Sequence, residues 1–169
     1  MTQAEEVLAQ IPLFHGLTNY QLKDISSISR EQRYKKGQVI IREGDSADIM
    51  YILIKGSVEI SRTVTINISK EQLGELEKSI VKLEAKDHPC FGEVALLEKS
   101  LRGATITALE DCHLLGIPGE AFDRICDKDS VLGYIVTKNI ARQLSARLRS
   151  TNQDVLKLTS ALSLALSRR

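Results

Sequence analysis

Short runs of β-forming residues, separated by glycines, constrain the fold of this chain most strongly. Between about residues 33 and 66, isoleucine and valine gather in short apolar runs. The runs cover residues 38–41, 49–54 and 58–60, and they are broken at Gly37, Gly44 and Gly56. Glycine allows the backbone conformations that tight turns require. Regularly spaced short strands with glycine turns predict a β-sandwich or a small barrel.

Helical patterns flank this β-rich region. Residues 2–10 and 18–28 carry apolar residues at helical spacing, which predicts two helices before the first strand. After the β-rich region we expect strands at 104–109 and 113–117, followed by a helix around Phe122. The pattern therefore predicts a mainly β fold with helices on its flanks.

Residues 61–86 do not continue the simple strand pattern. A polar segment at 70–78 precedes an expected strand at about 79–85. Two interpretations remain open, an elongated hairpin and a helical excursion, and both predict an exposed insertion.

An apolar seam runs along the C-terminal part of the chain. Its members are separated by steps of three and four residues: Ile140, Leu144, Leu148, Thr151, Val155, Leu158 and Leu162. This heptad-like spacing predicts one long helix with a single apolar stripe. Such a stripe needs a partner, either the barrel of the same chain or the same helix of a second copy. We expect a homodimer.

A carboxylate at position 93 and a guanidinium at position 102 flank an apolar turn within residues 91–105. Glu93 follows Gly92, and Arg102 precedes Gly103. A guanidinium offers a rigid fork of donors to phosphate oxygens, and a carboxylate accepts hydrogen bonds from sugar hydroxyls. Backbone N–H groups at the start of a short helix would add anion-binding dipoles. The segment therefore suits a small, singly anionic sugar phosphate.

This segment resembles the phosphate-binding cassette of the cyclic nucleotide-binding domain family, of the cAMP receptor protein and protein kinase A regulatory subunit type. In that family the Gly-Glu pair reaches the ribose 2′-hydroxyl, and the arginine holds the cyclic phosphate. The resemblance extends to the segments at residues 11–14, 36–40, 43–45, 51–53 and 55–58. It implies ligand-binding roles for Gly92, Glu93, Val94, Ala95, Arg102, Gly103 and Ala104.

The same resemblance implies the architecture and the function. We expect one domain over residues 1–169, with a helix-turn and a double-stranded β-helix (jelly-roll) barrel at 11–128. Residues 129–169 would form a long helix that serves for dimerisation or as a lid. The function implied is a cyclic-nucleotide sensor, with cAMP or cGMP as ligand, that regulates a partner through movement of this helix. No other cofactor is expected.

Two positions depart from the family pattern. Gly103 lacks the hydroxyl with which some family members contact guanine, and this favours cAMP over cGMP. We also expect Gly103 to use a backbone angle that a β-branched residue reaches only with strain. Residues 87–90 replace the usual glycine turn before the cassette, so the pocket entrance is expected to differ.

The expected output is another protein. In the cAMP receptor branch the long helix continues into a helix-turn-helix domain, but this sequence stops at Arg169. We therefore expect a stand-alone sensor that binds no specific DNA sequence directly and acts on an unknown output protein. The basic residues near the C-terminus are then the solvated face of a helix.

Composition excludes several other classes. The net charge of +1 gives no general attraction to nucleic acid or membrane, and no apolar run reaches membrane-spanning length. Three cysteines without a CxxC spacing, and an acidic N-terminus, indicate reduced thiols in the cytoplasm. The histidines form no metal-ligand pattern, although a metal or redox role for residues 88–90 stays open. Because no nucleophile has a helper residue, we expect no enzyme.

Two alternatives to the sensor remain. One is a ligand-free scaffold that keeps the barrel and the dimer helix, and the other is an accessory subunit of an output protein. Glu93 and Arg102 disfavour the scaffold, because an unpaired arginine in a dry pocket is costly without an anion.

Overall fold

The computed structural model describes residues 2–69 and 72–167. The helices are α1 (Gln3–Gln10), η1 (Pro12–Phe14), α2 (Asn19–Ile28), η2 (Ala85–Asp87), η3 (Glu93–Leu96), α3 (Gly119–Lys128) and α4 (Ser130–Ser167). The strands are β1 (Arg30–Tyr34), β2 (Val39–Ile41), β3 (Ser46–Ala47), β4 (Ile49–Lys55), β5 (Ser57–Ser69), β6 (Gln72–Glu84), β7 (Cys90–Phe91), β8 (Ser100–Leu101), β9 (Thr105–Ala108) and β10 (Cys112–Pro118).

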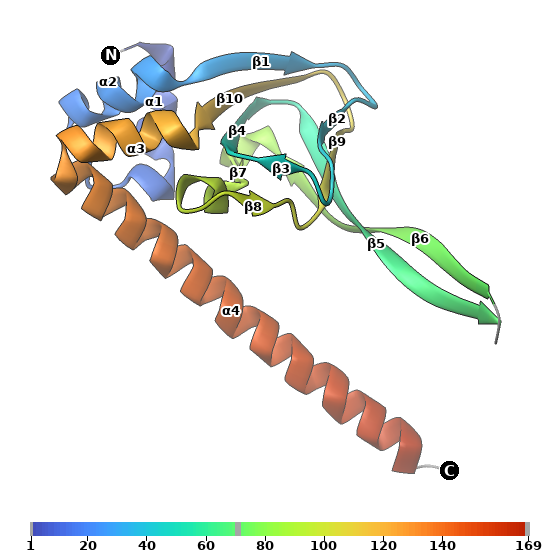
Figure 1. Ribbon diagram of the computed structural model, residues 1–169. Coiled ribbons are helices and arrows are strands. Elements are labelled where there is room, and N and C mark those ends of the chain that lie inside the picture. The colour runs from blue at the N-terminus through green and yellow to red at the C-terminus, as the bar shows by residue number, and fades with distance from the viewer. Residues whose placement is uncertain (1, 70–71, 168–169) are drawn as a thin grey trace.

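Two four-stranded antiparallel sheets form the centre of the molecule. Their strand orders are β1-β10-β4-β7 and β2-β9-β5-β6, and β3 pairs with β8 in a small third sheet. One core cluster fills the space within the barrel, including Leu53, Val58, Ile106 and Leu114. This arrangement confirms the predicted mainly β, jelly-roll fold with N-terminal helices and a long C-terminal helix (Figure 1).

The helices gather at one end of the barrel and bury a second core cluster. Leu8 from α1 and Ile25 from α2 are fully buried there, as is Ile52 from the adjoining strand β4. Capping boxes at Thr2 and Thr18 begin α1 and α2, which confirms the two predicted N-terminal helices. This cluster also holds the first turns of α4.

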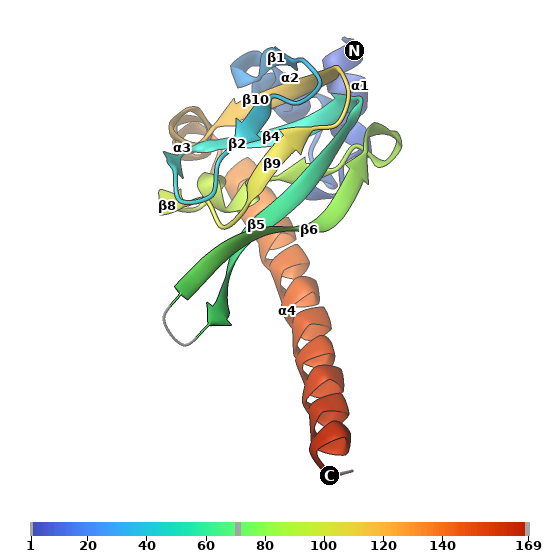
Figure 2. The same cartoon turned by 90° about the vertical axis from the view of Figure 1, so that its right-hand side faces the viewer.

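Residues 57–84 form an elongated hairpin, so the helical alternative for this region is wrong. The register of β5 and β6 runs from the pair Ser57–Glu84 to the pair Ser69–Gln72. Strand β9 pairs with β5 only as far as Ser61. Beyond that point the two strands pair with each other alone and project from the barrel on the same side as α4 (Figure 2). Residues 70–71, within the predicted polar segment, lie outside the described residues.

Sequence analysis missed strand β1 and the two-residue strands β3, β7 and β8. The sequence of β1, Arg-Glu-Gln-Arg-Tyr, has no apolar alternation because β1 is an edge strand that pairs only with β10. Edge strands favour charged residues, and a polar run gives no strand signal. The expected strand at about 79–85 also begins earlier, at Gln72.

Helix α4 leaves the molecule after its first turns. Leu132, Val136 and Ile140 are fully buried, whereas all residues from 145 to 167 are exposed. Within the described ranges, no helix is long and apolar enough to cross a membrane.

Candidate functional site

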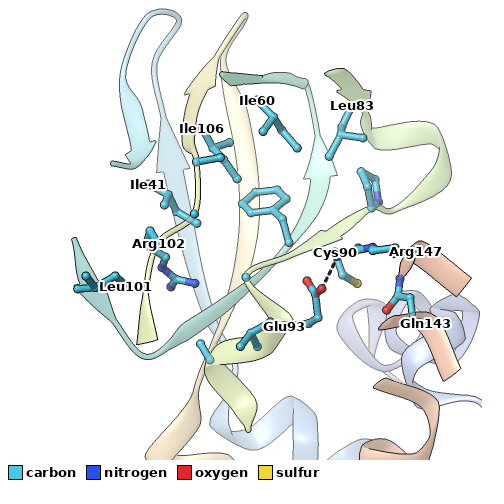
Figure 3. Close-up of a pocket in the computed structure, with 17 residues that line it drawn as sticks. Ile41, Ile60, Leu83, Cys90, Glu93, Leu101, Arg102, Ile106, Gln143 and Arg147 are labelled. Atoms are coloured by element: carbon cyan, nitrogen blue, oxygen red, sulfur yellow. Dashed lines mark hydrogen bonds and ion pairs between the residues drawn. The ribbon is translucent and has the colours of Figure 1, made fainter. Parts of the chain in front are cut away.

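A cavity of about 700 Å³ opens between the barrel and helix α4. Every residue to which the sequence assigned a ligand-binding role lines it: Gly92, Glu93, Val94, Ala95, Arg102, Gly103 and Ala104. Ile41, Ile60 and Ile106 form part of its apolar wall, and Gln143 and Arg147 face it from α4 (Figure 3). An apolar wall with a few converging polar groups is typical of a small-molecule site.

Gly92 shapes the turn that leads into this cavity. Its φ of +73° lies in the left-handed region, which favours glycine. A Cβ atom at this position would also collide with the guanidinium of Arg102 and come within 3.2 Å of the carbonyl oxygen of Ile49. Glycine is therefore needed here both for the turn and for the close approach of the arginine.

Arg102 is held by its backbone and by one side-chain hydrogen bond. Its N–H donates to Asp45 O at 2.9 Å, and its carbonyl oxygen accepts from Gly44 N at 2.9 Å. Its Nη2 donates to Ile49 O at 2.5 Å. These contacts fix the direction of the side chain, which Figure 3 shows at the cavity wall.

The guanidinium of Arg102 is buried without a counter-charge. The residue is 9% exposed, and its Nε atom is buried with no hydrogen-bond partner within the described residues. No carboxylate in the described ranges forms an ion pair with it. Burial lowers the pKa of Arg102, although arginine stays charged at neutral pH. A buried, unpaired cation of this kind fits an anionic ligand.

Glu93 lies at the first position of η3, deeper in the same cavity. It is 3% exposed. Arg147 of α4 donates from Nη1 to Glu93 Oε1, and this ion pair is the dashed line in Figure 3. Among the described residues, Glu93 is the only acidic one that lines the cavity, and it is thus bound to the long helix.

Not every backbone N–H group near these side chains is free to donate a hydrogen bond to a ligand. The N–H of Ala95 donates to Gly92 O at 3.0 Å within the turn, so this amide is already satisfied. Gly103 has no left-handed φ, and a Cβ atom there would meet only Arg62 Nη2, at 3.9 Å. The expectation that Gly103 requires a glycine conformation is therefore wrong.

His88 lies in the segment 87–90, which was expected to depart from a glycine turn, and it has a left-handed backbone conformation. Its φ is +42°, in the left-handed region, and its ring Nδ1 lies 3.4 Å from Leu53 O. The neighbouring Cys90 lines the cavity. Burial, with a smaller effect of the Glu93 charge, raises the pKa of the Cys90 thiol to about 12, so the thiol stays neutral. Within residues 2–69 and 72–167, no group of three His, Cys, Asp or Glu side chains is placed to hold a metal ion.

Sequence analysis missed Gln143 and Arg147 as residues of this site. Both lie on the long helix, where Arg142, Arg149 and Lys157 give the same basic signal as Arg147 and where Gln143 is one polar residue among many. Only the path of α4 across the cavity singles out Gln143 and Arg147. Their spacing of four residues, one helical turn, was the one available hint.

Comparisons with known proteins agree with this geometry. The sequence model of the "Cyclic nucleotide-binding domain" matches residues 31–129. A cGMP-dependent protein kinase of Toxoplasma gondii is 33% identical over 135 residues, which are 80% of this chain and 12% of the kinase. The cyclic AMP receptor protein of Thermus thermophilus is 28% identical over 144 residues, which are 85% of this chain and 60% of the receptor. The chain thus spans less than two thirds of either relative.

One solved structure superposes on this chain over nearly the whole length of that structure. The N-terminal domain of a transcriptional regulator from Streptomyces coelicolor superposes with a TM-score of 0.69 at 26% identity. The superposition covers 88% of this chain and 94% of that domain. The chain is therefore similar to a regulatory domain both in sequence and in fold.

Proposed function

Because this chain belongs to the cyclic nucleotide-binding domain family, we propose that it is a cyclic-nucleotide sensor that prefers cAMP. It regulates a partner protein through ligand-dependent movement of helix α4. The relatives named above include a cGMP-dependent kinase and a cyclic AMP receptor, so they do not choose between the two nucleotides.

The observation that carries this proposal is the buried, unpaired guanidinium of Arg102. A cyclic phosphate has one negative charge, which would neutralise that cation and satisfy its free Nε–H. The other two charges that line the cavity, on Glu93 and Arg147, already offset each other. A monoanion therefore balances the charge of the site.

Glu93 is assigned to the ribose. A carboxylate has two oxygens with about four acceptor positions, and one Glu93 oxygen accepts from Arg147. The 2′-hydroxyl of a ribose would donate to the same carboxylate. The segments around Gly92 and Gly103 surround the phosphate, with Val94, Ala95 and Ala104 in the wall.

The preference for cAMP rests on Gly103. A glycine at this position supplies no side-chain hydroxyl for the guanine edge. Gln143 of α4 is a further candidate for base contacts, because glutamine pairs well with the N6 and N7 atoms of adenine.

The switch is assigned to the ion pair between Glu93 and Arg147. A ligand that binds Glu93 changes the hydrogen-bond partners of this carboxylate. It thereby changes the strength of the ion pair that joins the barrel to α4. A ligand shifts a conformational equilibrium only through contacts that differ between the two states, and this pair is such a contact. The response of α4 to nucleotide then depends on Arg147.

The exposed seam of α4 is assigned to a homodimer. Leu148, Val155 and Leu158 are 62%, 54% and 70% exposed in the single chain, although their spacing is that of a coiled-coil seam. Pairing with a second copy would bury them. The unpaired thiols of Cys90, Cys112 and Cys126 support a reducing, cytoplasmic location.

A second candidate function, the ligand-free dimerising scaffold, is favoured by one observation. Glu93, the proposed ribose acceptor, is already paired with Arg147 in the structure. In a scaffold this pair would be permanent and would fix α4 for dimerisation. The scaffold predicts that no cyclic nucleotide binds.

Calorimetry with cAMP and Arg102→Ala tests the proposed function. We expect the wild type to bind one cAMP per chain, and Arg102→Ala to weaken binding by about 2–5 kcal/mol because the phosphate loses its charged donor. Arg124→Ala is the matched control, since Arg124 is exposed on α3 and does not line the cavity.

A thermal melt of each variant shows whether the fold is intact. A change of less than threefold for folded Arg102→Ala would place the phosphate elsewhere. An absence of binding by the wild type would favour the scaffold.

A further inference from the structure

A second pocket lies at the far end of the barrel from the helices. It has a volume of about 380 Å³ and is lined by Arg33, Tyr34, Lys35, Lys55, Asp111, Cys112 and His113. These residues come from the ends of β1 and β4, the start of β10 and the adjoining turns. The volume falls within the range of small-molecule pockets.

The sheet register gathers basic residues at this pocket. Arg33 of β1 lies opposite His113 of β10, and His113 lies opposite Lys55 of β4. Arg33 and Lys55, both exposed, thus flank His113 in a row across three neighbouring strands.

Neighbouring carboxylates compensate this row only in part. Asp111 accepts from Lys35 Nζ at 2.6 Å and from the N–H of Lys36 at 3.1 Å. Each of its two oxygens thus accepts one hydrogen bond, and these bonds, with smaller effects of the Lys35 and Lys55 charges, lower the pKa of Asp111. In the part of the chain that the structure describes, no carboxylate forms an ion pair with Arg33 or Lys55.

An unsatisfied buried atom at the same pocket points in the same direction. The Nε2 atom of His113 is shielded from solvent and makes no hydrogen bond within the described residues. Glu31 Oε2 lies 3.2 Å from it, at ion-pair distance if the ring is protonated, although the two atoms form no hydrogen bond. The pocket therefore combines two exposed cations, Arg33 and Lys55, with a histidine whose Nε2 makes no hydrogen bond within the described residues.

This pocket is separate from the proposed nucleotide site. Arg102 contacts Ile49 at the start of β4, whereas Lys55 ends the same strand. Six steps of about 3.3 Å place these ends about 20 Å apart. Among the residues that the structure describes, none lines both pockets.

We propose that this second pocket binds the phosphate group of a small phosphorylated molecule. Arg33 supplies a forked donor, Lys55 a point charge and His113 a ring N–H, which are the groups that hold phosphate oxygens. Because the pocket is larger than one phosphate ion, it leaves room for the rest of the molecule. The neutral wall is Tyr34, whose pKa burial raises to about 12 and whose hydroxyl donates to Gln32 Oε1 at 2.7 Å.

A chemical-shift titration of the backbone amides tests this site. Inorganic phosphate and glucose 6-phosphate are added at constant ionic strength to the wild type, to Arg33→Ala/Lys55→Ala and to Lys36→Ala. Lys36 is the matched control, since it adjoins the pocket without lining it. We expect saturable shifts at residues 33–35, 55 and 111–113, with affinity at least tenfold weaker in the double variant and within twofold in the control. Tighter binding of glucose 6-phosphate identifies a phosphorylated molecule as ligand, and equal affinities identify the free ion.

Three results would overturn the proposal. Shifts that sodium chloride reproduces at the same ionic strength indicate screening alone. Equal weakening by Lys36→Ala indicates a diffuse charge effect, and weakening by Arg102→Ala instead indicates binding in the first cavity. Affinity for cAMP is measured in the double variant and should be unchanged, so failure of this site and failure of the proposed nucleotide function are distinguished.

Discussion

The two halves of helix α4 have different surroundings. From Ser130 to Leu144 the helix packs on the helical core, and Leu132, Val136 and Ile140 are fully buried. From residue 145 to 167 every residue is exposed, although the apolar seam continues through Leu148, Val155, Leu158 and Leu162. The chain itself therefore packs the first half and leaves the described part of the second half exposed.

The proposed ligand site lies at the boundary between these halves. Gln143 and Arg147 line the cavity there, and Arg147 binds Glu93 of the cassette. A single ion pair thus joins the exposed half of the helix to the buried carboxylate. The proposed coupling between ligand and helix would therefore act at this boundary.

The largest expected effect concerns the exposed half. Leu148→Glu together with Val155→Glu should convert a homodimer into monomers that still fold, with a dimer dissociation constant at least about a hundredfold higher, because the charges would face their copies across an apolar seam. Sedimentation velocity measures the change. Ser150→Glu with Gln153→Glu is the control, since both residues are exposed on the other side of the helix. A wild type that stays monomeric at high concentration contradicts the assignment.

The second prediction compares the two halves directly. In the monomeric background, Ile140→Ala should lower the free energy of unfolding by about 2–5 kcal/mol, because it leaves a cavity in a core with no exposed surface. Leu156→Ala should change it by less than about 0.5 kcal/mol, since Leu156 is 67% exposed and lies off the seam. Urea unfolding measures both. Equal losses would show that the second half is also packed within the single chain.

The third prediction concerns the boundary. Glu93→Ala should weaken cAMP binding by about 1.5–3 kcal/mol, because a charged acceptor for the ribose hydroxyl is lost. The variant should also lose the preference for ribose over 2′-deoxyribose. Calorimetry with cAMP and 2′-deoxy-cAMP measures this, with Glu98→Ala as an exposed control. A preference that survives in Glu93→Ala would move the ribose contact elsewhere.

The smallest expected effect is at Gly103. Gly103→Thr should raise the affinity for cGMP relative to cAMP by about 1 kcal/mol, the scale of one neutral hydrogen bond. No strain should offset this gain, since a Cβ atom meets only Arg62 Nη2 at 3.9 Å. The ratio of the cGMP affinity to the cAMP affinity in Gly103→Thr is compared with the same ratio in Gly103→Ala. A wild type that binds cGMP more tightly than cAMP would refute the argument from Gly103.

Local sequence signals predicted much of the fold and part of the site. Glycine turns and β-branched runs located β4 and β10, and the cassette residues Gly92 to Ala95 do lie beside Arg102. These features depend on short-range backbone geometry, which a single sequence carries.

The parts that sequence missed depend on long-range packing. Strand β1 is a polar edge strand with no apolar pattern of its own. Arg147 looks like its basic neighbours until the path of α4 places it over Glu93. The glycine-only backbone angle expected at Gly103 is absent, whereas Gly92 has a left-handed φ of +73°.

The central claim is that nucleotide in the cavity controls the helix at its boundary, and hydrogen exchange with and without cAMP tests it most directly. The account predicts slower exchange in peptides that cover residues 90–104 and a changed rate in residues 143–150. It predicts that cAMP leaves the exchange rate of residues 132–140 unchanged. In Arg102→Ala, cAMP should change the exchange rate of no segment. Protection of the cassette without any change at residues 143–150 would contradict the coupling, and unchanged exchange in both segments would contradict nucleotide binding itself.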